Sequence, residues 1–220
     1  MHRWFALGLL SLLMAGCEPL AEEEAPADDA NAVVDTTLAT ATPVAPPANF
    51  ANVDEALAAL TKATDAKDTD AVKAAYNWLS QQDGSAVPAV VAAMNNASAS
   101  IEARRIACRA LSQLGAASAA PLVEASRSDE LPLKLKAIEA MPAVDPQQKI
   151  IVDRLIVLLD DENDQARRAA IRSLGQIGPA AKRSAKKLIA IQNNPRLDEM
   201  TRDEADMAVK RVNPRKTFND

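Results

Sequence analysis

One segment recurs four times along this chain, at intervals of 30 to 35 residues. The two clearest copies begin at Ala103 and Ala166, two others begin at Leu133 and Thr201, and a fainter copy covers residues 71–83. Self-similarity at a period of this length is typical of proteins built from stacked units, each of which buries its apolar face against its neighbours. The period therefore predicts an open linear array of repeats rather than a chain wrapped around one central core.

The apolar residues within each copy have helical spacing. Three positions, separated by four and then three residues, fall on one helix face; they hold Ala107, Leu111 and Leu114, then Ala137, Met141 and Val144, then Ala170, Leu174 and Ile177, then Ala205, Val209 and Val212. The copies end at Gly115, Asp145, Gly178 and Asn213, where we expect the left-handed backbone that closes many helices. A second helix is expected after each turn, because proline is favoured in a first helical turn; the residues are Pro88, Pro121, Pro146 and Pro179. The chain has only 6 glycines and 3% aromatic residues, which argues against a β-sandwich or barrel.

This pair of helices in just over 30 residues resembles the HEAT repeat, in particular the short bacterial variety first noted in phycobilin lyases. The resemblance is carried by a small residue three positions after a basic one, by the ending Leu174-Gly175-Gln176-Ile177-Gly178, and by the basic position itself, which holds Arg104, Lys134, Arg167 and Arg202. It covers about residues 66–214 and implies an all-α, right-handed α-solenoid of four to five helix pairs, with the second helices lining the concave face. Pro142 should shorten or kink one first helix, because proline removes a backbone donor.

The N-terminus has the features of a targeting segment. A positive start at Arg3 precedes an apolar run of 11 residues from Trp4 to Met14, whereas a membrane-spanning helix needs about 20. This pattern predicts a secretory signal peptide. Its end, Leu13-Met14-Ala15-Gly16-Cys17, resembles the bacterial lipoprotein signal, although Met14 stands where that family prefers Leu. The resemblance implies cleavage before Cys17, acylation of Cys17, and, with Glu18 next, attachment to the outer membrane facing the periplasm; an ordinary signal peptide with an accidental cysteine is the alternative.

The segment that follows Cys17 has the composition of a tether. Residues 18–50 contain seven acidic residues, five prolines and no Lys or Arg, and such a segment cannot bury enough apolar surface to fold. The predicted organisation is therefore a signal peptide at 1–16, a lipidated and disordered acidic tether at 17–50, a capping helix at 51–65, repeats at 66–214 and a tail at 215–220. The tether could instead be an acidic bait for a basic partner.

Charge is distributed unevenly along the repeats. Residues 51–162 hold 11 basic and 16 acidic residues, whereas residues 163–220 hold 13 basic and 7 acidic ones. A basic patch suggests an anionic partner, such as an acidic protein face, lipid phosphates or an anionic cell-wall polymer. The candidate partner-binding residues are Lys182, Arg183, Lys186, Lys187 and Arg154. A solvated helix face with local ion pairs is the alternative.

The apolar stretch at 150–159 is a second candidate surface. A helix that is apolar on all sides is either fully buried or exposes an apolar face that can bind a partner. In the second case Ile151 or Val157 could anchor a partner.

Few residues remain for familiar catalytic chemistry. The single histidine, His2, lies in the predicted signal peptide, so His-based triads and His-ligated metals are not expected in the mature chain. Lipidation of Cys17 would leave Cys108 as the one remaining thiol, which excludes an internal disulfide or a Cys-rich zinc site; Cys108 is expected in the core, or alternatively as a free thiol. We therefore expect no cofactor, no metal, no small-molecule substrate and no enzyme activity.

Together these features predict a membrane-anchored envelope lipoprotein whose repeats form a protein–protein interaction scaffold or adaptor. The main alternative is a binder of anionic envelope polymer or lipid through the basic C-terminal third. A lyase-like or hydrolytic enzyme subunit is a more remote alternative, by analogy with the resembled family. A nucleic-acid partner is not expected for an exported protein.

Overall fold

The computed structural model describes residues 49–145 and 149–214 of the chain. The predicted signal peptide, the lipidation site Cys17, almost all of the predicted tether and the tail at 215–220 lie outside these residues. The α-helices of the described part are α1 (Val53–Asp65), α2 (Thr69–Leu79), α3 (Val87–Asn95), α4 (Ile101–Leu111), α5 (Ala119–Ala125), α6 (Leu131–Ala140), α7 (Lys149–Leu158), α8 (Asp164–Ile177), α9 (Ala185–Gln192) and α10 (Glu199–Val212). Short 3₁₀ segments are η1 (Gly84–Ala86), η2 (Ala116–Ser118), η3 (Met141–Ala143) and η4 (Gly178–Ser184).

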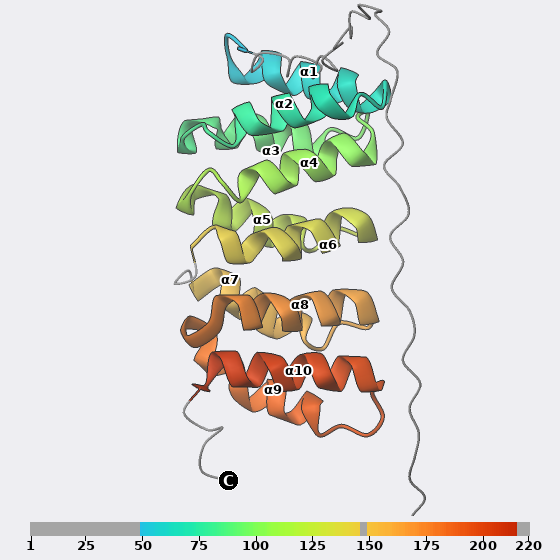
Figure 1. Cartoon of the computed structure of the whole chain (residues 1–220), viewed down its shortest axis with the longest axis vertical. Coiled ribbons are helices and arrows are strands. Elements are labelled where there is room, and N and C mark those ends of the chain that lie inside the picture. The colour runs from blue at the N-terminus through green and yellow to red at the C-terminus, as the bar shows by residue number, and fades with distance from the viewer. Residues whose placement is uncertain (1–48, 146–148, 215–220) are drawn as a thin grey trace, which may run out of the picture. The chain divides into compact units, whose positions relative to one another are not determined.

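The helices of the described residues stack in two layers (Figure 1). Helices α2, α4, α6, α8 and α10 pack one against the next and form the even layer, and α3, α5, α7 and α9 lie behind them in the odd layer. Helix α1 packs on α2, α3 and α4 at the N-terminal end of the stack. The predicted all-α stack of helix pairs is thus confirmed. Within residues 49–145 and 149–214 no helix combines the length and the apolar character that crossing a membrane requires.

The repeated small residue explains how closely the even-layer helices approach one another. Ala107, Ala137, Ala170 and Ala205 are at most 1% exposed, and an alanine on a facing surface lets two helix backbones approach closely. The backbones of α8 and α10 approach so closely that a Cβ added to Gly175 would lie 3.3 Å from both Cα and Cβ of Ala208. Larger side chains such as Leu111 fill the space between the layers, and burying each one contributes about 1.5–3 kcal/mol.

Some of the helix ends have the backbone conformation that the sequence predicts, and others do not. Gly115 and Gly178 have the expected positive φ, 80° and 66°, but their ψ values of −166° and −135° place them in an extended region that is open essentially to glycine, outside the left-handed helical one. Asn213 has a φ of −140°, and Asp145 is not among the residues with positive φ, so the expectation of a positive φ was wrong at these two positions. A non-glycine residue with positive φ is strained by its Cβ, which explains the difference. Pro142 acts as predicted, since α6 ends at Ala140 and a 3₁₀ segment follows.

The last helix has a polar residue where the earlier repeats have an apolar one. Cys108, Ile138 and Ile171 occupy one repeat position and are 0% exposed. In α10 this position holds Asp206, whose carboxylate accepts a hydrogen bond from the Gln192 side chain at 2.9 Å and pairs with Lys210 at 2.6 Å. Terminal repeats of a solenoid need a polar outer face, and Asp206 provides one for the even layer.

Candidate functional site

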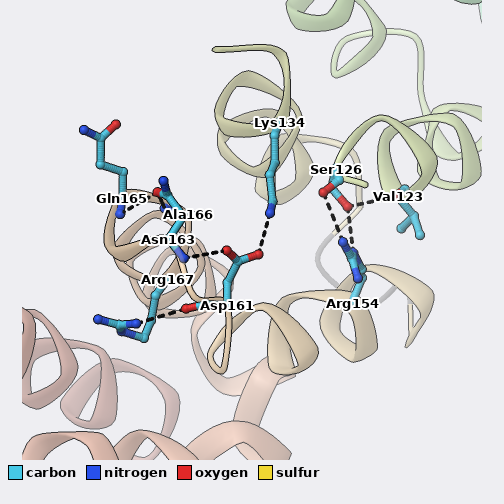
Figure 2. A network of polar contacts seen from close by, with 9 residues as sticks. All are labelled: Val123, Ser126, Lys134, Arg154, Asp161, Asn163, Gln165, Ala166 and Arg167. Carbon is cyan, nitrogen blue, oxygen red and sulfur yellow. Dashed lines mark hydrogen bonds and ion pairs between the residues drawn. The ribbon is translucent and has the colours of Figure 1, made fainter. Parts of the chain in front are cut away.

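The predicted site residue Arg154 binds the end of the preceding odd-layer helix (Figure 2). Its Nε donates to the Ser126 hydroxyl at 2.8 Å and its Nη2 donates to the Ser126 carbonyl at 3.0 Å. Ser126 is the buried residue that follows α5. The last carbonyls of a helix lack partners within the helix and carry partial negative charge, so a cation there satisfies both needs. Burial lowers the pKa of Arg154, and the nearby charge of Arg127 adds to this effect; a guanidinium nevertheless stays protonated at neutral pH.

Two further predicted site residues bind α7 in a similar way. Arg183 donates from Nη2 to the Lys149 carbonyl at 2.6 Å and pairs with Asp153 at 2.8 Å. Lys187 donates from Nζ to the Ile156 carbonyl at 2.9 Å and also pairs with Asp160. Arg154, Arg183 and Lys187 therefore join successive odd-layer helices, and we call these interactions the inter-repeat cation contacts.

The other two predicted site residues face solvent. Lys182 and Lys186 are exposed, and neither side chain has a hydrogen bond or ion pair with a residue that the structure describes. The structure therefore divides the predicted set of five cations: three bind neighbouring helices and two remain available to a partner.

An exposed apolar pair lies on α7. Ile150 is 44% exposed and Val157 is 58% exposed; they are two helical turns apart and so share a face. Of the two anchors considered from the sequence, Val157 is exposed and Ile151 is buried. Periodicity could have separated them, because Ile151 shares a helix face with the buried Leu155 and Leu158, whereas Ile150 and Val157 do not.

The even layer carries its own polar contacts between repeats. Lys134 pairs with Asp161 at 2.6 Å (Figure 2), and one repeat earlier Arg104 pairs with Glu130 at 2.6 Å. The basic position of the repeat also reaches backbone carbonyls, since Arg104 donates to the Met94 carbonyl of α3 and Arg167 to the Asp161 carbonyl in the loop between α7 and α8, both at 2.9 Å. These contacts give a structural reason for a basic residue at this repeat position.

Asp161 lies at the centre of one such contact. Partial burial alone would raise its pKa, but the bonds from Lys134 and from the Asn163 N–H outweigh this, and the pKa lies below its ordinary value. The carboxylate therefore stays charged while it bridges α6 and the start of α8.

Cys108 belongs to the core. It is 0% exposed, and burial raises the pKa of its thiol to about 12. Since the thiolate is the reactive form, the geometry favours the core interpretation of Cys108 over the reactive one. No group of three or more His, Cys, Asp or Glu side chains suited to holding a metal ion occurs in the described ranges.

Comparison with solved structures finds a similar fold. The structure of the complex of CpcE and CpcF of phycocyanin lyase from Nostoc sp. PCC7120 matches with a TM-score of 0.55 and 20% sequence identity. The match covers 78% of this chain and 69% of the other. This likeness shows that the chain has the HEAT-like helical fold. No protein-family model and no curated protein matches the chain.

The comparison corrects one expectation. No enzyme activity was expected from the sequence, with a lyase-like or hydrolytic subunit as a remote alternative, because stacked helix pairs form an open ribbon without a familiar catalytic set. The same helical fold occurs in a complex described as a phycocyanin lyase, so an open ribbon of helices is compatible with an enzyme. The expectation that the chain is not an enzyme is contradicted by this finding.

Proposed function

We propose that this chain binds another protein through the exposed face of its odd layer, as a scaffold or as a subunit of a larger assembly. The observation that carries the proposal is the pair Ile150 and Val157, 44% and 58% exposed on α7. Exposed apolar residues beside polar ones are typical of the centre of a protein interface. Two cations lie beside this pair, since Arg183 reaches the Lys149 carbonyl, next to Ile150, and Lys187 reaches the Ile156 carbonyl, next to Val157.

Rigidity also supports this proposal. The inter-repeat cation contacts bind α7 on both sides, through Arg154 to the end of α5, through Arg183 to η4 and through Lys187 to α9. A surface that is ordered before binding loses less conformational entropy when a partner docks. The similar solved structure is itself a complex of two subunits.

A pull-down from solubilised cell envelopes with the full-length chain tests this function. We expect one specific protein to be recovered by the native chain and lost with the double substitution Ile150→Ser and Val157→Ser. Met200→Ser is the matched control, because Met200 is 60% exposed on α10, in the other layer. Recovery of the same protein by all three chains, or of none by the native chain, contradicts the proposal.

We also propose that the chain is lipid-anchored in the bacterial cell envelope, at the outer membrane and facing the periplasm. The support comes from the sequence 13–17, with its small residues before Cys17, and from Glu18 after it. Mass spectrometry of the mature N-terminus tests it, with a diacylated or triacylated Cys17 as the expected first residue. An unmodified Cys17, or a mature chain that begins elsewhere, contradicts the anchor and leaves the protein-binding function standing.

A lyase-like subunit is the second candidate function. It is favoured by the fold shared with the phycocyanin lyase complex, at 20% identity. If this candidate is right, the protein recovered in the pull-down changes in mass when incubated with the chain and a soluble extract of the same cells. Intact-mass measurement of that protein with and without the chain distinguishes a lyase-like subunit from a scaffold.

A further inference from the structure

The odd-layer helix α7, with the turn that follows it, offers its neighbour a defined set of groups along one edge. Four groups face η4 and α9: the Lys149 carbonyl, the Asp153 carboxylate and the Ile156 carbonyl of α7, and the Asp160 carboxylate of the turn after it. Arg183 binds the Lys149 carbonyl and the Asp153 carboxylate, and Lys187 binds the Ile156 carbonyl and the Asp160 carboxylate. This edge therefore accepts cations from the helix that follows it in the stack.

The same edge of the last pair of elements, η4 and α9, has no described helix packed on it. The positions 33 residues after those of α7 are Lys182, Lys186, Ile189 and Asn193. No odd-layer helix follows α9 in the described chain, and α9 and α10 end the stack (Figure 1). We call Lys182, Lys186, Ile189 and Asn193 the terminal edge.

The terminal edge has the opposite charge from the edge of α7. Lys186 stands where α7 has Asp153, and Asn193 stands where α7 has Asp160. The two lysines are one helical turn apart, are exposed, and have no ion pair among the described residues. A helix with cations at the positions of Arg183 and Lys187 would be repelled here, whereas one with carboxylates would be attracted.

An apolar residue lies between these polar groups. Ile189 is half-buried against the core, and it occupies the position of Ile156, which is half-buried beside α9. In the even layer the corresponding end carries the Asp206–Lys210 ion pair, which gives that layer a polar outer face. The terminal edge thus combines an apolar centre with two unpaired cations, as expected of a surface that receives another helix.

We propose that the terminal edge docks an acidic helix of another protein, which stacks on α9 as the next odd-layer helix would. The partner helix presents two carboxylates one turn apart to Lys182 and Lys186, and an apolar side chain to Ile189. The proposal rests on the protein-binding function, and it names a second surface and the chemistry of the segment that occupies it.

Photo-crosslinking from the edge itself tests the proposal. A benzoylphenylalanine is placed at Asn193 of the full-length chain in intact cells, and the crosslinked peptide is mapped by mass spectrometry. We expect a helical segment of another protein with at least two Asp or Glu residues within one turn. We expect Lys182→Glu with Lys186→Glu to lower the crosslink yield at least tenfold. The matched control, Lys62→Glu with Lys73→Glu, reverses two exposed cations at the other end of the stack and should leave the yield within twofold.

Other outcomes overturn the proposal. Crosslinks to lipid, to an anionic polymer, to a second copy of this chain or to a segment without acids identify a different occupant. A yield that charge reversal does not change removes the electrostatic basis, provided that circular dichroism shows both variants melting like the native chain. A second crosslinker at Val157 separates the two hypotheses: a protein captured from Val157 alone supports the proposed function and rejects the terminal edge, whereas no protein captured from either position rejects both.

Discussion

Arg154 and Ser126 are 28 residues apart in the chain, and the guanidinium of the first closes the helix end at which the second lies. Two hydrogen bonds, 2.8 Å to the hydroxyl and 3.0 Å to the carbonyl, form this contact. The hydroxyl in turn donates to the Val123 carbonyl at 2.7 Å. A charged donor thus binds the fully buried Ser126, and neighbouring repeats are joined by polar contacts as well as by apolar packing.

Removal of this guanidinium should destabilise the repeats. Arg154→Ala leaves the buried Ser126 carbonyl without its cationic donor, and we expect the free energy of unfolding to fall by about 2 kcal/mol. Urea denaturation followed by circular dichroism measures the change. Arg196→Ala is the control, because Arg196 is exposed and its side chain has no bond to a described residue; equal effects of the two substitutions would contradict the role given to Arg154.

The ion pair of Asp161 should make stability depend on acid pH. Because the folded-state pKa of Asp161 is lowered, its contribution is present above the unfolded pKa of about 4 and is lost as pH falls through the folded pKa. We expect Asp161→Asn to cost about 1–2 kcal/mol at pH 7 and progressively less below pH 4. Urea unfolding at a series of pH values measures this, with Glu162→Gln, at the exposed neighbouring residue, as the control. A cost for Asp161→Asn that does not change with pH would rule out the charge as its cause.

The close approach of α8 and α10 should exclude a large side chain at Gly175. A Cβ added there would lie 3.3 Å from Ala208, so Gly175→Leu must separate the two helices, and overpacking of this kind costs about 1–3 kcal/mol. Gln176→Leu places the same side chain at the exposed neighbouring position and should change stability by less than about 0.5 kcal/mol. Thermal denaturation of both variants compares them, and a Gly175→Leu chain as stable as the native one would show that α10 is not tightly packed.

Cys108 should be inert while the chain is folded. With a thiol pKa of about 12, the thiolate fraction at pH 8 is roughly a thousandfold below that of a free cysteine. A Cys17→Ser chain, which retains only Cys108, should react with a thiol reagent at this reduced rate or more slowly, and at the ordinary rate in guanidinium chloride. Rapid labelling of the native protein would show that the α4 region opens readily.

The sequence predicts the stack well because its evidence is periodic. The spacing of Ala107 and Leu111 and their repeats identifies helices and their buried faces, and Pro142 identifies a helix end. The sequence also indicates the polar residue at Asp206, since this residue aligns with the buried Ile171 when the copies are superposed. The period shows which residues occupy equivalent positions in successive repeats, and these equivalences are enough to predict the fold.

The contacts of the cations could not be predicted in the same way. Whether Lys187 points to solvent or to the Ile156 carbonyl depends on the distance and angle between α7 and α9, which the spacing within one helix does not determine. The pattern therefore grouped Lys182, Arg183, Lys186 and Lys187 as one basic surface, although two of them bind α7. The exposed pair on α7 was partly missed because the stretch 150–159 was interpreted as apolar on all sides, although the helical spacing of the buried Ile151, Leu155 and Leu158 leaves Ile150 and Val157 on another face.

The inter-repeat cation contacts all run in one direction, from a later helix to an earlier one. Arg154 closes α5, and Lys187 closes α7. A ribosome makes α5 before it makes Arg154, and α7 before it makes Lys187, so these two helices wait for the next repeat to be synthesised before their ends are closed. A nascent chain that stops short of residue 187 has an α7 whose Ile156 carbonyl still lacks the Lys187 donor, and the array reaches its full stability only after its final repeat has emerged.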